Sequence, residues 1–281
     1  MKTWKKIVLG VSLISLFLGG GLVAWGYSQG GLIDLQNQTK SEQDYVKKEV
    51  DDFSKIDIKS SSYNVLIKNG EVDKATLSYY QKTKNPIDTS VKDGQLTIND
   101  NNSELDSTSN KHINFFGLKD LVRLSTLNEE VRNKTIVITL PKKQTIDFLK
   151  VDLATGNLDL SNSTIKQADI NLNVGDLTFT KMIVSNLKAN LDVGSVDSDH
   201  TLFTNSDLSI AMGDYSGDNL IFNGHNKLDV TSGDIEIVLK DYTLNVQADS
   251  HSGEVDITNN LKISKDNTLT ITSDLGDITV E

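Results

Sequence analysis

The chain contains no cysteine among its 281 residues. This absence excludes a disulfide framework, a thiolate metal site, a cysteine nucleophile and a lipid anchor on an N-terminal cysteine. Proline is almost as scarce, with two residues, and arginine occurs only as Arg123 and Arg132. Few prolines together with many Asn, Asp, Ser and Thr residues are typical of short strands joined by polar turns.

Positive charge is in the minority, since 28 Lys and Arg residues face 39 Asp and Glu residues and give a net charge of −11. Nucleic-acid phosphates would be repelled by such a surface, so we expect no nucleic-acid partner. Phosphate loops, metal-ligand spacings and nucleophile motifs are missing as well. We therefore expect no cofactor and no catalytic residue. The sequence by itself does not reveal a molecular activity.

An uncharged stretch at residues 7–27 follows three lysines, Lys2, Lys5 and Lys6. It is long enough to span a bilayer as a helix, and the preceding lysines predict a cytoplasmic N-terminus with the bulk of the chain outside. Residues 1–30 are therefore expected to form a single-pass anchor in the cell membrane. The alternative is a signal peptide that is cleaved after Ala24-Trp25-Gly26.

Residues 31–52 are polar and charged, and we expect a linker there with a short helix around residues 42–50. Residues 53–150 are expected to form an N-terminal β part, because apolar residues alternate with polar ones in several short runs. Strands are predicted at residues 76–80, 94–98 and 136–140.

The dominant feature of residues 151–281 is a recurring glycine, usually followed by a small polar or acidic residue and then an apolar one. Successive glycines lie 19, 19, 19, 20, 20 and 23 residues apart, at Gly156, Gly175, Gly194, Gly213, Gly233, Gly253 and Gly276. A fixed period near 20 predicts stacked repeats. Glycine would let the chain turn sharply with a positive φ, and the polar residue after it could bond the amides of its own turn.

Three apolar columns appear when the repeats are aligned on their glycines. The position two residues after the glycine is apolar in all seven repeats, and the positions nine after and three before it are apolar in the first five. Three columns with polar neighbours predict coils with about three inward-facing sides. The expected fold class is all-β, a β-solenoid (parallel β-helix-like) with coils of 19–20 residues. An antiparallel sandwich would not need its repeats in phase.

The same offsets occur earlier in the chain, so residues 53–72 are expected to be a degenerate repeat with Tyr63 in the place of the glycine. Residues 99–133 interrupt the β pattern. The second half of this insertion is apolar, and its candidate cap or docking residues are Phe115, Phe116, Leu118, Leu121 and Val122. They could cover an open end of the core or dock on a partner or membrane.

The strand Ile136-Val137-Ile138-Thr139-Leu140-Pro141, followed by serial Gly-Asp-Leu/Ile repeats, resembles the putative-adhesin family of bacterial envelope proteins. This family of unknown function includes LiaG-like proteins. The resemblance covers about residues 53–281. It implies a β-strand-repeat ectodomain at the cell envelope, often behind one membrane segment and associated with envelope stress or regulation. It carries over no catalytic residues.

Four aspartates share the position after the glycine, namely Asp176, Asp214, Asp234 and Asp277. A ladder of carboxylates about 4.8 Å apart could bind calcium. However, the glycine-rich calcium nonapeptide is absent, so turn capping is the simpler interpretation. The four histidines fall at different repeat offsets, and no stacked imidazole site is expected.

The expected function is adhesin-like binding, scaffolding or an envelope-stress role, with a cell-wall polymer or an envelope protein as partner. Alternatives are an enzyme acting on wall polysaccharide and a regulatory partner of a membrane signalling system, acting through residues 113–131. One further expectation concerns Val280-Glu281, which end the last predicted strand. An exposed edge there could pair with a second copy or with a partner strand.

Overall fold

The computed structural model describes residues 43–82, 85–100 and 134–281. Residues 44–281 form one compact unit. The described residues contain 23 β-strands, most of which pair in parallel, so the fold is all-β and consistent with a β-solenoid. Among these residues no helix is long and apolar enough to cross a bilayer. The anchor predicted at residues 7–27 lies outside the described residues.

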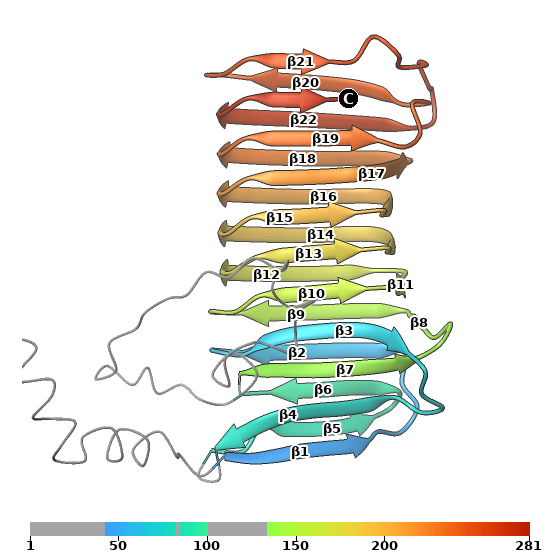
Figure 1. Ribbon diagram of the computed structural model, residues 1–281, viewed down its shortest axis with the longest axis vertical. Coiled ribbons are helices and arrows are strands. Elements are labelled where there is room, and N and C mark those ends of the chain that lie inside the picture. Colours follow the sequence, from blue (N-terminus) through green and yellow to red (C-terminus); the bar gives the residue numbers. More distant parts are fainter. Residues whose placement is uncertain (1–42, 83–84, 101–133) are drawn as a thin grey trace, which may run out of the picture. The chain divides into compact units, whose positions relative to one another are not determined.

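Each coil crosses one sheet, turns at a corner and returns through a second sheet, as the stacked strands of Figure 1 show. Sheet A contains, in spatial order, β1 (Gln43–Glu49), β4 (Thr76–Lys82), β7 (Thr135–Pro141), β3 (Asn64–Gly70), β10 (Leu158–Ser161), β13 (Leu177–Thr180), β15 (Val196–Asp199), β17 (Tyr215–Asn223), β19 (Ile235–Leu239), β23 (Ile278–Val280) and β21 (Val255–Ile257).

Sheet B contains, in the same direction, β5 (Asp88–Lys92), β6 (Gln95–Asn99), β2 (Lys55–Ser60), β9 (Phe148–Leu153) with the short β8 (Thr145–Ile146), β12 (Ala168–Val174) with the short β11 (Thr164–Ile165), β14 (Ile183–Val193), β16 (Leu202–Met212), β18 (His225–Ser232), β22 (Thr268–Leu275) and β20 (Asn245–Ser250).

The apolar columns expected from the sequence line the space between the two sheets. Leu158, Leu177 and Val196, each two residues after a corner glycine, are in register on sheet A and fully buried. Period-two alternation puts these side chains inside and their neighbours outside. The prediction of in-phase coils is confirmed.

The three inward-facing columns expected from the sequence are all buried in the first four repeats, and two of them share sheet B. Val184 and Leu191, which represent those two columns, lie on the same strand, β14. The strand bends between them instead of ending. Asn186 and Asn205, its equivalent in the next coil, take positive φ values of 47° and 55° at the bend. Asparagine tolerates this conformation better than most residues.

The degenerate repeat at residues 53–72 is confirmed. Val65 pairs with Leu158, which places Tyr63 at the corner position that glycine holds in the next coil. The predicted strands at 76–80, 94–98 and 136–140 are present as β4, β6 and β7. Two of the neighbouring pairs, β4 with β7 and β5 with β6, are antiparallel.

The coils do not stack in chain order at either end. β23 lies between β19 and β21, and β22 lies between β18 and β20, so residues 268–281 insert between two coils that precede them. At the other end β2 lies between β6 and β9, and β3 lies between β7 and β10. We call this arrangement the interleaved ends.

The expectation of an exposed edge at Val280-Glu281 is therefore wrong. The amide of Glu281 donates to the carbonyl of Ile237 at 2.8 Å, and the carbonyl of Val280 accepts from the amide of Thr258 at 2.8 Å. Strands on both sides already use the backbone groups that an incoming strand would need. Among the described residues, β20 and β21 form the free edges at this end of the stack.

The short helix expected around residues 42–50 is also wrong, because Gln43–Glu49 form strand β1, which pairs with β4. Part of the stretch assigned to a linker thus belongs to the sheet. The insertion residues Phe115, Phe116, Leu118, Leu121 and Val122 lie outside the described residues.

Candidate functional site

The corner column explains why glycine recurs. Six of the seven glycines have φ between 142° and 148°, a region that L-residues with a side chain rarely adopt. The stacking adds a second requirement, since a Cβ at Gly194 would lie 1.9 Å from the carbonyl oxygen of Gly175, and one at Gly156 would lie 2.4 Å from that of Tyr63. The backbones of adjacent coils therefore touch at this corner.

The residues after the glycines form a hydrogen-bonded ladder between coils. The side chain of each accepts a bond from the backbone amide of its equivalent in the next coil: Asp176 from Ser195 at 3.0 Å, Asp214 from Asp234 at 2.9 Å, and Asp234 from Asp277 at 2.9 Å. Ser195 and Asn157 serve the same role. The sequence predicted capping of the same turn, but the acceptor caps the neighbouring coil.

This ladder accounts for the four aspartates that were candidates for calcium. One oxygen of each of Asp176, Asp214 and Asp234 is occupied by an amide, and Asp277 accepts from Glu254 at 2.8 Å. Within the described ranges, the carboxylates of this column do not form a group of three with ligand atoms close enough to share an ion. Turn capping is the role that the geometry supports.

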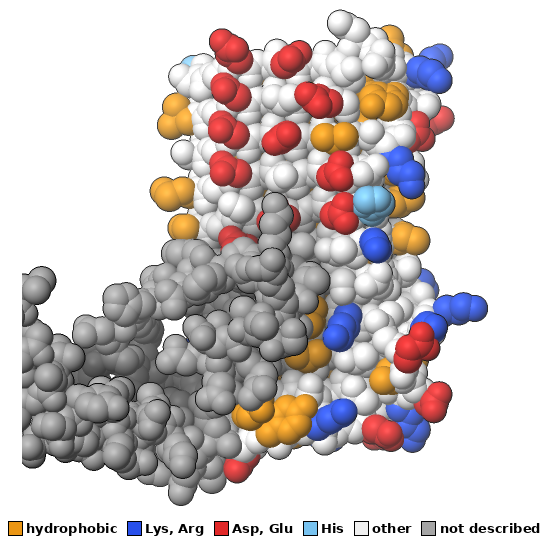
Figure 2. All heavy atoms as spheres, in the orientation of Figure 1, with side chains coloured by type: hydrophobic (Ala, Val, Ile, Leu, Met, Phe, Trp, Pro, Cys, Tyr) orange, Lys and Arg blue, Asp and Glu red, His pale blue; other side chains and the backbone are white. Residues whose placement is uncertain are grey.

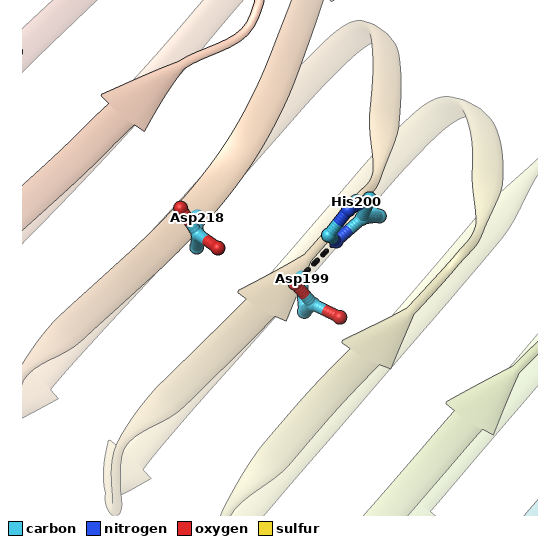
Figure 3. A group of neighbouring side chains, drawn as sticks. All are labelled: Asp199, His200 and Asp218. Carbon is cyan, nitrogen blue, oxygen red and sulfur yellow. Dashed lines mark hydrogen bonds and ion pairs between the residues drawn. The ribbon is translucent and has the colours of Figure 1, made fainter.

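One other group does bring three such side chains together, as Figure 3 shows. Asp199 at the end of β15 is in register with Asp218 of β17, and His200 follows Asp199. The ligand atoms of all three lie within 4.8 Å of one another, and His200 Nδ1 is 2.6 Å from Asp199 Oδ1. Two carboxylates and an imidazole could coordinate a divalent cation. Their exposure to water weakens the attraction for such an ion.

This group was not expected from the sequence, because the four histidines do not stack with one another. The available signal was a different one: Asp199 and Asp218 are 19 residues apart, one coil length, and His200 is adjacent to the first of them.

The outward side of sheet A is strongly acidic over its C-terminal coils, and the rows of acidic side chains are visible in Figure 2. Strands β13, β15, β17, β19, β21 and β23 contain no lysine or arginine. We call the following residues the acidic face: Asp197, Asp199, Asp214, Asp218, Asp234, Glu236, Glu254, Asp256 and Asp277. All of them are exposed or half-buried.

Asp159 differs from the acidic face although it occupies the same column as Asp197. It is 2% exposed, and neither of its carboxylate oxygens has a hydrogen-bond partner in the part of the chain that the structure describes. Burial, with a smaller contribution from the charge of Asp176, raises the pKa of Asp159 to about 8. Loss of hydration disfavours the charged form of a carboxyl group. The burial of Asp159 could not be predicted from the sequence, because its place in the alternating pattern is that of an outward-facing strand residue.

Sheet B offers a polar groove of about 430 Å³, lined by Asn205, Ser206, Asp207, His225, Asn226, Lys227, Thr268 and Thr270. It lies where the coil length increases from 19 to 20 residues, and Gly224 takes a φ of 66° there. Buried Asn226 stabilises its floor, since Asn226 Oδ1 accepts from the Ser206 amide at 3.0 Å and from its hydroxyl at 2.8 Å. Hydrolysis of glycosides generally requires a pair of carboxylates, and this lining includes only Asp207.

The coil stack, the glycine corner and the exposed side faces define a repeat protein of the β-solenoid type. Within that class the chain belongs to the toastrack family DUF4097, whose model matches residues 53–281. The resemblance noted from the sequence is thereby confirmed. No curated protein matches the chain in sequence.

Several solved structures are similar to the chain, each over 85% of its length. A putative cell adhesion protein from Clostridium sporogenes shares 16% identity over 98% of its own chain, with a TM-score of 0.37. A putative adhesin from Bacteroides fragilis shares 15% over 97%, with a TM-score of 0.38. A putative lipid binding protein from Parabacteroides distasonis shares 11% over 97%, with a TM-score of 0.34. Likenesses of this size carry no functional argument.

Proposed function

We propose that the chain is a membrane-anchored, extracytoplasmic binding or scaffolding protein of the cell envelope, adhesin-like in its mode of action. Membership of the toastrack family, which is described without an enzymatic activity, is compatible with this role. The uncharged stretch at 7–27 behind Lys2, Lys5 and Lys6 supports a single-pass anchor with the repeats outside.

The observation that carries the proposal is the pair of long, regular side faces. On sheet A the ladder between coils fixes the corner of the acidic face. On sheet B the side-chain amide of Asn190 donates to Asn171 Oδ1 and that of Asn171 donates to Asp152 Oδ1, both at 2.9 Å. Polar groups held in such rows are preorganised to bind a polymer or a protein surface, because little side-chain entropy remains to be lost.

The test is site-specific photocrosslinking in intact cells with the full chain. A crosslinker at Ser216, on the outward side of sheet A, is expected to capture an envelope protein or wall polymer. The matched control is a crosslinker at Leu228, which is 4% exposed. Protease treatment of intact cells should remove the repeat region. Absence of capture at Ser216, or repeats that stay protected inside the cell, would contradict the proposal.

A regulatory partner of a membrane signalling system is the second possibility retained from the sequence, through residues 113–131. That segment lies outside the described residues. Its deletion distinguishes the two roles: loss of signalling with unchanged crosslinking at Ser216 would favour the regulatory one.

A further inference from the structure

The free end of the coil stack is formed by β20 and β21, since the interleaved ends place the chain's C-terminal strand inside. Among the described residues β20 pairs with β22 alone and β21 with β23 alone. The loop that follows β21 pairs with the residues that precede β20. The amide of Leu244 donates to the carbonyl of Lys262 at 3.1 Å, and the amide of Lys262 donates to the carbonyl of Tyr242 at 2.8 Å.

The backbone groups on the outer edge can be assigned from their neighbours. The amide of Asn245 donates to Asn267 at 3.0 Å and that of His251 to Ser273 at 2.8 Å, both toward β22. Because successive amides of a strand point to opposite sides, those of Val246, Ala248 and Ser250 point away from β22.

The same reasoning applies to β21. The amide of Thr258 donates to the carbonyl of Val280 at 2.8 Å, so the amides of Val255 and Ile257 point away from β23. The end coil therefore presents a row of backbone donors and acceptors on each of its two sheets. Such an edge is a template for an added strand.

The apolar columns of the core are also open at this end. Val255 is 41% exposed, whereas its neighbour Ile278 in the next coil is 0% exposed. Val246 and Ile257 are half-buried, and they pair with Leu269 and Val280, which are 1% and 0% exposed. A strand laid on this edge would bury these side chains in addition to pairing the backbone.

The charges at this end indicate which strand would fit. Asp249, Glu254 and Asp256 are exposed at or beside the two edge strands. A second copy docked end to end would bring the same carboxylates together, and like charges opposite each other in a sheet are destabilising. Cationic side chains at these positions would be attracted instead.

We propose that the end coil binds a segment of a protein partner that follows the coil around its corner, with two extended stretches in which apolar residues alternate with lysine or arginine, by strand addition to β20 and β21. The apolar residues cover Val246, Val255 and Ile257, and the cationic ones face Asp249 and Asp256. This inference rests on the proposed binding role and assigns it a site.

The probe is a fluorescent synthetic peptide of about thirteen residues, in which two stretches of alternating valine and lysine are joined by a glycine at the corner, titrated into the full chain in mild detergent. Ala248→Pro removes one outward amide and leaves the net charge unchanged. We expect it to weaken binding about tenfold, because an edge donor is lost and the ring obstructs pairing. The melting temperature should stay nearly constant, since that amide points away from β22, the only strand paired with β20 among residues 43–82, 85–100 and 134–281.

Two controls separate strand addition from simple charge attraction. Gln247→Pro removes an amide that faces β22, so it should lower the melting temperature. Asp214→Asn with Asp234→Asn removes two charges from the middle coils and should leave peptide affinity within about twofold, whereas Glu254→Gln with Asp256→Asn should reduce it severalfold.

Equal affinity of the wild type and Ala248→Pro would overturn the proposal, as would absence of peptide binding. A wild-type oligomer that Ala248→Pro dissociates would identify a second copy as the occupant and overturn it too. Continued crosslinking of Ser216 in cells under any of these results would show that the site assignment has failed while the proposed function has not.

Discussion

At the scale of single residues, the corner glycines do two things that the sequence revealed only in part. A positive φ was predictable from a glycine at a sharp turn. The contact between the backbones of adjacent coils was not, because it depends on how closely successive corners stack. Asp159 shows the same limit, since its burial distinguishes it from exposed residues of the same column.

Gly194→Ala should destabilise the fold by more than about 4 kcal/mol, because the added methyl group needs both a forbidden φ and the space of a backbone carbonyl. Urea unfolding of the full chain measures this. Gly94→Ala is the control, since Gly94 also has a positive φ, 72°, but nothing lies within 4 Å of the added Cβ. That change should cost only about 1 kcal/mol. Similar losses at both positions would contradict the proposed close approach.

The raised pKa of Asp159, about 8, predicts a pH dependence of stability. The folded state binds this proton more tightly than the unfolded chain, whose aspartates titrate near a pKa of about 3.9. The stabilisation is therefore complete below pH ~4 and is lost as the pH rises to ~8. Asp159→Asn should retain more of its stability than wild type between pH 5 and pH 9 in thermal unfolding.

The control for that experiment is Asp197→Asn, which changes an exposed carboxylate in the same column. This variant should follow the wild-type pH profile. If Asp159→Asn does so as well, the Asp159 carboxyl is not the group that is protonated in the folded state.

At the scale of elements, the sequence predicted most strands and their phase but not the order of the coils. Every coil presents the same columns to the coil on either side, so Ile235 of β19 could stack on Val255 or on Ile278 equally well by pattern. The order of the coils therefore depends on the length and path of the connections between the strands. The helix expected around residues 42–50 failed for a related reason, since pairing of β1 with β4 outweighs local propensity.

Ile278→Ala tests the order of the coils. Ile278 is fully buried between β19 and β21, so its truncation should cost about 3 kcal/mol. Ile257→Ala, in the end coil and only half-buried, should cost less than about 1 kcal/mol. The free energies of unfolding of both variants are measured by chemical denaturation. A larger loss at Ile257 would mean that the coils follow chain order and that residues 268–281 form the end.

At the scale of the whole repeat unit, the two sheets differ in charge over the C-terminal coils. There the sheet A strands contain no lysine or arginine, whereas the sheet B strands carry Lys188 and Lys227 together with acidic residues. The net charge of −11 predicted an acidic surface, but the absence of cations from these sheet A strands follows from the register of the coils. The group of Asp199, His200 and Asp218 arises in the same way, from residues one coil length apart.

Crowding of like charges on the acidic face should make the unit more stable at higher ionic strength. We expect the melting temperature to rise by a few degrees between about 20 mM and 500 mM NaCl, because the screening length falls below the spacing of the more distant carboxylates. Asp214→Asn with Asp234→Asn should reduce that rise. A melting temperature that falls as the salt concentration rises would contradict repulsion between the carboxylates of the acidic face.

The interleaved ends have a consequence for how the protein is made. A ribosome delivers β20 and β21 before β22 and β23, yet in the folded structure the former pair with the latter. The native pairing of residues 245–257 can therefore form only after residues 268–281 have emerged and paired with β18 and β19. A solenoid whose coils stack in chain order could fold one coil at a time as it leaves the ribosome. A chain truncated before residue 268 would lack β22 and β23, the strands with which β20 and β21 pair in the folded structure.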